Sequence, residues 1–103
     1  MNEKNLTDPR LRERAQRLCA VMKAVSGHDP LDETRRRAVV MARMMVASAL
    51  LAEGYTENAV GTVLGWDHST IHHYRKRMNE VMTTPGYEAE KEILGKFKKC
   101  ISI

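Results

Sequence analysis

The segment from Ala38 to Ala52 is apolar at almost every position, and only Arg43 and Ser48 interrupt it. A helix of this length is too short to cross a bilayer, which takes about 20 apolar residues. A helix that is apolar on nearly all sides is instead typical of the centre of a protein, where neighbouring helices cover it. We therefore predict a central helix from roughly Glu33 to Glu53, ended by Gly54.

The other elements are also predicted to be helices. Asp8 and Pro9 form a typical helix start, an acidic cap followed by proline in the first turn. Apolar residues then follow at spacings of three and four, which predicts one buried stripe on a helix that ends at Gly27. This stripe consists of Leu11, Ala15, Leu18, Met22 and Val25. His28 to Asp32 is predicted to be a connector.

Capping and turn residues predict three further helices. The first is short, with Thr56 as its cap, and ends at Leu64 before a turn at Gly65. The second is capped by Asp67 and runs to about Met82, where Thr83-Thr84-Pro85-Gly86 ends it. The last runs from Tyr87 to Cys100 and is expected to turn four side chains inward, namely Tyr87, Ile93, Leu94 and Phe97.

Length and composition agree with a single all-α domain over residues 1–103. Aromatic residues make up only 5% of the chain, whereas methionine occurs seven times, so the core is expected to be aliphatic and rich in sulfur. Cys19 and Cys100 form neither a disulfide framework nor a metal-binding pair, which indicates buried or partly buried free thiols. With no signal peptide or membrane span in view, we expect a soluble, cytoplasmic protein, encoded by a bacterium or a phage.

The charge points towards an anionic partner. The formal net charge is +4 and the sequence pI is about 9.3, values that are compatible with a nucleic-acid-binding domain. Three consecutive arginines at the start of the predicted central helix oppose its dipole, so we expect something outside the helix to use their charge. The basic residues cluster in four groups: Arg10 to Arg17, Arg35 to Arg37, Arg75 to Arg77 and Lys96 to Lys99.

The two predicted helices joined at Gly65 are typical of a helix-turn-helix over about residues 56–82. At about 100° per residue, the second helix separates into an apolar face and a polar face. The polar face begins with short hydrogen-bonding side chains and becomes basic farther along, the order that a reader of the DNA major groove needs. The inward face is predicted to hold Ile71, Tyr74, Met78, Val81 and Met82, and the outward face His68, Ser69, His72, His73 and Lys76.

Three stretches resemble the C-terminal DNA-binding domain of the bacterial replication initiator DnaA. Gly65 to His73 (GWDHSTIHH) resembles the family's signature glycine-arginine-aspartate-histidine-threonine-threonine run. Thr34 to Arg37 resembles the basic segment before the family's long helix, and Ala42 to Met45 resembles the alanine-arginine pair inside it. Altogether the resemblance covers Arg35 to Cys100, and extends more loosely from Ala15 onward.

The resemblance implies a Trp-repressor-like helical fold that reads a short duplex box, in replication-origin recognition or its regulation. Bases in the major groove would be contacted by Asp67, His68 and Ser69. Arg35 would enter the adjacent minor groove, with Arg37 as a second candidate there. The residues expected at the DNA backbone, from the resemblance and from the basic face of the second helix, are Thr70, Arg37, Arg43, His73, Lys76 and Arg77.

The chain also departs from the family. Trp66 stands where the signature has a basic residue, the glycine turn is one residue shorter, and Glu57-Asn58 replaces a leucine-proline pair. No GxxxxGK[ST] phosphate-binding loop occurs, so we expect no nucleotide or other cofactor and no enzymatic activity. His68 and His72 are four residues apart, but the position after His68 is Ser69 and not the glutamate of a zinc protease motif, so no metal is expected.

Two other functions remain open at this level. A transcription regulator would use the same helix-turn-helix and the same base-reading chemistry. A protein-interaction module, meeting replication or regulatory proteins, would show DNA affinity that is absent or indifferent to sequence.

Overall fold

The structure is a computed structural model that describes residues 9–102. Within this range it is all-helical, as predicted. Its helices are α2 (Pro9–Ser26), α3 (Arg37–Ala52), α4 (Glu57–Leu64), α5 (His68–Thr83) and α6 (Glu88–Ile101). None of the helices in the described part of the chain is long and apolar enough to cross a membrane.

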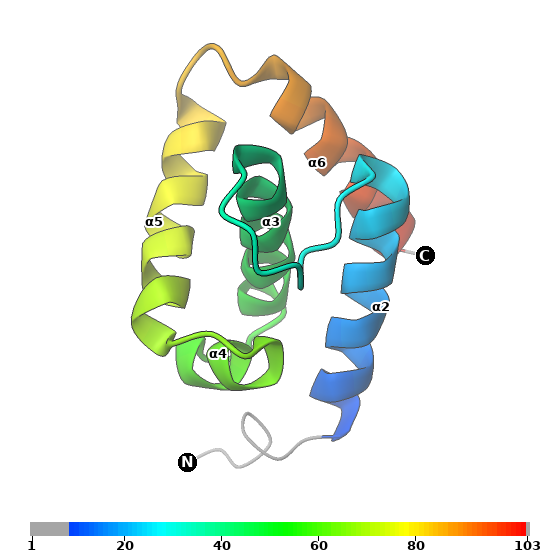
Figure 1. The fold of residues 1–103 in the computed structure, drawn as a ribbon, viewed down its shortest axis with the longest axis vertical. Coiled ribbons are helices and arrows are strands. Elements are labelled where there is room, and N and C mark those ends of the chain that lie inside the picture. Colours follow the sequence, from blue (N-terminus) through cyan, green and yellow to red (C-terminus); the bar gives the residue numbers. More distant parts are fainter. Residues whose placement is uncertain (1–8, 103) are drawn as a thin grey trace.

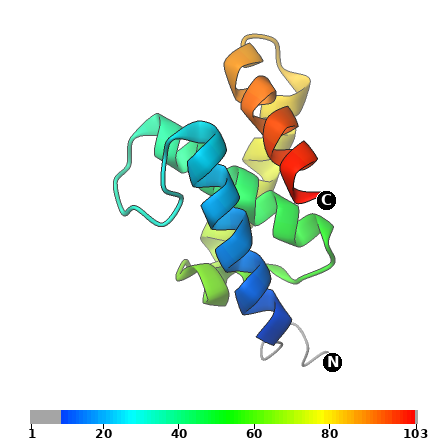
Figure 2. The same ribbon diagram turned by 90° about the vertical axis from the view of Figure 1, so that its right-hand side faces the viewer.

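Helix α3 lies at the centre, as its apolar sequence predicts (Figure 1). Helices α2 and α5 flank it, α4 lies across one end, and α6 packs against α2 (Figures 1 and 2). All seven residues from Met41 to Ala47 are buried, including the charged residue Arg43. The surrounding helices contribute their predicted faces, and the largest fully buried side chains include Leu18, Met22, Ile71, Val81 and Phe97.

The prediction that Met82 belongs to the core is wrong. Met82 was expected on the inward face of α5, but its side chain is 43% exposed. Its position lies at the margin of the apolar stripe, and it comes one residue before the helix ends at Thr83. Periodicity defines the centre of a buried face better than its edge, because the width of the face depends on which neighbouring helices cover it.

The start of the central helix is also different from the prediction. Residues 33–36 are not helical, the backbone of Arg36 is extended, and α3 begins only at Arg37. Local side chains stabilise this non-helical conformation, since Asp32 Oδ1 accepts from the Thr34 amide at 3.1 Å and Thr34 Oγ1 accepts from the Arg36 amide at 3.3 Å. Such bonds compete with helical ones. Three consecutive arginines therefore do not occupy the first helical turn, and most of the expected conflict with the helix dipole is avoided.

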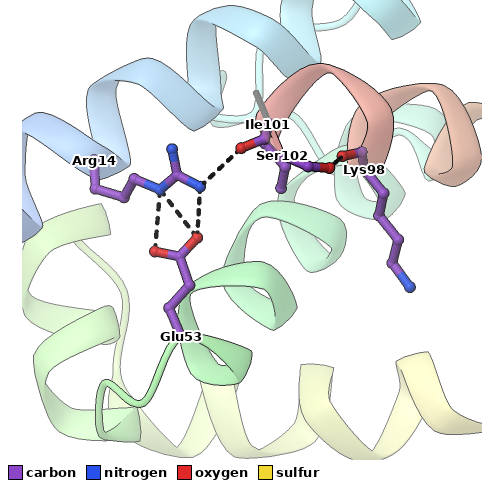
Figure 3. A network of polar contacts seen from close by, with 5 residues as sticks. All are labelled: Arg14, Glu53, Lys98, Ile101 and Ser102. Carbon is purple, nitrogen blue, oxygen red and sulfur yellow. Dashed lines mark hydrogen bonds and ion pairs between the residues drawn. The ribbon is translucent and has the colours of Figure 1, made fainter.

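An ion pair and a hydrogen bond from Arg14 connect α2 with the ends of α3 and α6 (Figure 3). Arg14 of α2 donates to both carboxylate oxygens of Glu53, with Nη2 at 2.8 Å from Oε2. Arg14 Nη2 also donates to the carbonyl of Ile101 at 3.3 Å. A cation at the last turn of α6 complements the partial negative charge of that helix end. Arg14 therefore ties α2 to the end of α3 and to the end of α6.

Candidate functional site

The caps of α4 and α5 are confirmed as the sequence predicts them. Thr56 Oγ1 accepts from the amide of Ala59 at 3.1 Å. Gly65 ends α4 with φ at 81°, the left-handed conformation that favours glycine. Asp67 Oδ1 accepts from the amide of Ser69 at 3.3 Å at the start of α5. We call α4, the turn at residues 65–67 and α5 the α4–α5 unit.

Gly61 brings the turn of this unit close to α4. The amide of Trp66 donates to the carbonyl of Gly61 at 2.8 Å, so the chain folds back over the helix directly after Gly65. The backbone of the turn occupies the space where a side chain at Gly61 would lie. This role of Gly61 was not predicted from the sequence, although a glycine inside a helical pattern can have a packing reason.

The residues expected to contact bases are exposed together at the start of α5. Asp67, His68 and Ser69 are all exposed, and Thr70 beside them is half-buried. His68 Nδ1 lies 3.4 Å from Asp67 Oδ1, the same oxygen that caps the helix. Within the described chain the contacts of Asp67 use Oδ1, so Oδ2 is directed to no protein partner. This geometry leaves one carboxylate oxygen for a ligand while the cap is kept.

Farther along α5, two exposed side chains share a carboxylate from α4. His72 Nδ1 lies 2.9 Å from Glu57 Oε2, and Arg75 Nη1 donates to the same oxygen at 3.1 Å. The hydrogen bond with His72, followed by that with Arg75, lowers the pKa of Glu57 below its ordinary value. We call Glu57 with His72 and Arg75 the Glu57 clamp. It was missed from the sequence, because Glu57 comes 15 residues before His72 and only the packing of α4 on α5 brings them together.

The expected phosphate contacts on α5 differ in their surroundings. His73 and Lys76 are exposed. Arg77 is exposed as well, but its Nη1 donates to Glu80 Oε1 at 2.9 Å, so a neighbouring carboxylate already offsets its charge. This bond is the first cause of the raised pKa of Arg77.

In the basic segment, residues 34–37, Arg35 and Arg37 lie beside different parts of the protein. Arg35 is exposed and lines a hollow of about 670 Å³ together with Trp66 and Thr70 of the α4–α5 unit. Arg37 is directed towards α6 instead, with Nη2 at 3.6 Å from Glu90 Oε2 and its guanidinium 5.5 Å from the centre of the Tyr87 ring. Of the two minor-groove candidates, the structure therefore brings only Arg35 beside the start of α5.

Arg43 is not placed to contact a DNA backbone. Arg43 is only 4% exposed. Its guanidinium donates to the carbonyls of Pro30, Asp32 and Thr34 and to the hydroxyl of Tyr74. It also lies 4.1 Å from the centre of the Trp66 ring. The expected phosphate contact of Arg43 is therefore wrong for this conformation, because internal acceptors already occupy its donors.

The cysteine and histidine residues show no metal centre in the described part of the chain. Among residues 9–102, no group of three or more His, Cys, Asp or Glu side chains is arranged to hold a metal ion. Cys19 and Cys100 are free thiols, the first buried and the second exposed. His72, one of the two histidines considered as a ligand pair, is held by Glu57.

Comparison with protein-family models, with curated proteins and with solved structures gives no match to this chain.

Proposed function

We propose that this chain binds double-stranded DNA in a sequence-specific manner, with the start of α5 in the major groove and Arg35 in the adjacent minor groove. The observation that carries the proposal is that Arg35 and Thr70 line one hollow, although they are 35 positions apart in the sequence. The two candidate DNA-contacting elements thus border the same hollow, which supports contact of both with a single duplex.

The start of α5 has chemistry suited to base edges. Asp67 Oδ2 can accept from the exocyclic amine of cytosine, Ser69 can donate or accept, and His68 adds a ring with one donor and one acceptor. The helix has 16 residues and is thus about 24 Å long at 1.5 Å per residue. The major groove is about 12 Å wide and admits such a helix.

Phosphate contacts would surround this reading surface. Thr70 borders the hollow, and His73 and Lys76 are exposed on α5. Contacts of this kind position a protein on the duplex without reading its sequence. Arg37 and Arg77 are weaker candidates, because Glu90 and Glu80 lie beside them.

The resemblance to the DNA-binding domain of DnaA suggests the biological setting. It supports a Trp-repressor-like helix-turn-helix and a role in recognising a replication origin or in regulating that recognition, with replication or regulatory proteins as further partners. Trp66 departs from the basic residue of the family signature, so the preferred box need not be the usual initiator box. A transcription regulator is the alternative, because it would use the same contacts for another purpose.

Selection of bound duplexes from a random library tests the proposal most directly. We expect enrichment of one short box, and affinity for that box that falls steeply between about 50 and 200 mM salt, because lysine and arginine displace counterions from phosphates. Enrichment of no sequence would contradict the proposal. Equal affinity for all duplexes, or none, would favour a protein-interaction module.

A further inference from the structure

We infer that Arg43 and Trp66 couple the segment of residues 30–36, which carries Arg35, to the α4–α5 unit. The two proposed DNA-contacting elements then keep a fixed position relative to each other. Arg43 is thereby a positioning residue rather than a DNA contact. The inference rests on the proposed function for its consequence at DNA, but its structural part is independent of DNA.

On one side, Arg43 holds the segment between α2 and α3. Nε donates to the carbonyl of Pro30 at 3.1 Å, and Nη2 donates to the carbonyls of Asp32 and, at 3.3 Å, of Thr34. These carbonyls belong to every second residue, from the turn at Pro30 to the non-helical residues before α3. Figure 1 shows this segment crossing in front of α3, between α2 and α5.

The segment has few other bonds that fix it to the core. Several of its amides bond within the segment itself: Leu31 donates to Asp29 Oδ1 at 2.9 Å, and Thr34 and Arg36 donate to the side chains two residues before them. Such local turns set the shape of the segment but not its position on the protein. The position is set by the bonds from Arg43, together with the burial of Pro30.

On its other side, Arg43 contacts the α4–α5 unit. Nη1 donates to the hydroxyl of Tyr74 in α5 at 3.3 Å, and the guanidinium lies over the ring of Trp66 at 4.1 Å from its centre. A flat guanidinium can use its edge for hydrogen bonds and its face for an aromatic ring at the same time. Lysine offers only a compact ammonium and would keep the charge while losing most of these contacts.

The consequence is a fixed distance between Arg35 and the start of α5. Arg35 follows Thr34, whose carbonyl Arg43 holds, and Thr70 and Trp66 line the hollow that Arg35 borders. If the segment were loose, Arg35 would lose conformational freedom on entering a minor groove, and that loss would weaken its contribution to binding. Arg43 and Trp66 therefore set the spacing between the minor-groove and major-groove contacts.

A double-mutant cycle on the selected box tests the coupling. In the wild-type background, we expect Arg35→Ala to weaken binding about tenfold or more. In an Arg43→Lys background, the same change should cost less than about threefold, because Arg35 is no longer held in place. Trp66→Phe, which keeps an aromatic face, serves as the control and should retain most of the wild-type coupling. Equal losses from Arg35→Ala in all backgrounds would overturn the inference.

Amide hydrogen exchange without DNA supplies a second readout. Arg43→Lys should speed exchange at residues 31–36 by about tenfold or more, while the amides of α6 stay protected, because loss of the anchor opens this segment locally. Unchanged exchange at residues 31–36 would overturn the inference. If the wild-type protein selects no DNA box, the proposed function fails and this measurement alone decides the coupling. Should Arg43→Lys not fold, Trp66→Leu removes the contact between Arg43 and the turn before α5 and leaves the hydrogen bonds of Arg43. The cost of Arg35→Ala at the selected box should then fall as in the Arg43→Lys background, and an unchanged cost would overturn the inference.

Discussion

A β-carbon on Gly61 would stand 2.5 Å from the backbone carbonyl oxygen of Trp66. Glycine is therefore required in the middle of α4, because any side chain would push against the backbone of the turn that leads into α5. The pair fixes how closely the turn approaches α4, and so where α5 begins.

We predict that Gly61→Ala lowers the free energy of unfolding by about 1–3 kcal/mol, as overpacking does, even though alanine favours helices. Gly95→Ala is the matched control, since Gly95 is also helical and a β-carbon there meets nothing within 4 Å. It should stabilise the protein by about 0.5–1 kcal/mol. Thermal or urea unfolding measures both. A stabilised Gly61→Ala variant would show that the turn can move away without cost.

Replacing Arg14 by methionine should destabilise the protein by about 1 kcal/mol, because the contacts with Glu53 and with the end of α6 are lost. Arg17→Met is the control on the same helix, as Arg17 is exposed and has no ion pair among the described residues. Urea unfolding of the two variants compares them at equal change of charge. Equal midpoints would mean that the network in Figure 3 adds nothing to stability.

The Glu57 clamp predicts a dependence of stability on acid. The pKa of Glu57 is lowered from its ordinary value of 4.5, so its ionised form stabilises the folded state. This contribution is complete above about pH 4.5 and is lost as the pH falls through the lowered pKa of the folded state. The stability difference between wild type and Glu57→Gln should therefore be present at pH 6 and shrink towards pH 3. A difference that is constant with pH would assign the effect to packing instead.

The two thiols should differ in reactivity. Burial, and then the nearby Asp29, raises the pKa of Cys19 from 9.0 to about 11, whereas Cys100 is exposed. Alkylation at pH 8 should be slow in Cys100→Ser, which keeps only Cys19, and fast in Cys19→Ala, which keeps only Cys100. Comparable alkylation rates would mean that Cys19 is accessible.

Because the raised pKa of Cys19 favours the neutral thiol, its contribution to stability is present below pH 9 and lost as the pH rises through about 11.

At the proposed reading surface, His68→Ala and Asp67→Ala should each relax discrimination at one or two base pairs by about 1–3 kcal/mol. Asp67→Ala also removes a helix cap, at a cost of about 1 kcal/mol in stability. Asp67→Ser separates the two effects, because serine keeps the cap and removes the carboxylate. Binding to the selected box and to its single-base variants measures the discrimination. Asn79→Ala, an exposed change later in α5, should leave the preference unaltered, and wild-type preference in every variant would mean that the reading surface lies elsewhere.

Local chemistry made much of this fold predictable. Thr56, Gly65 and Asp67 act within three or four residues of their own positions, so their roles in capping and turning follow from the sequence. The apolar run around Met44 likewise indicates burial on all sides.

The other features of the site could not be predicted, because they depend on contacts between residues far apart in the sequence. The segment before α3 is bonded to the core by Arg43. The family resemblance implied a DNA contact for this residue, whereas the structure buries it. The Glu57 clamp arises only because α4 lies across α5. In each case a charged residue has a partner far away in the sequence, and neither spacing nor periodicity contains that information.

The position of Trp66 has a practical consequence. It is the single tryptophan of the chain, so tryptophan fluorescence from the unlabelled protein comes from one place, where the guanidinium of Arg43 lies over the indole. The emission wavelength and quenching of that one ring follow the junction between the segment of residues 30–36 and the turn before α5. The protein therefore contains its own optical reporter at the place where its two proposed DNA-contacting elements meet.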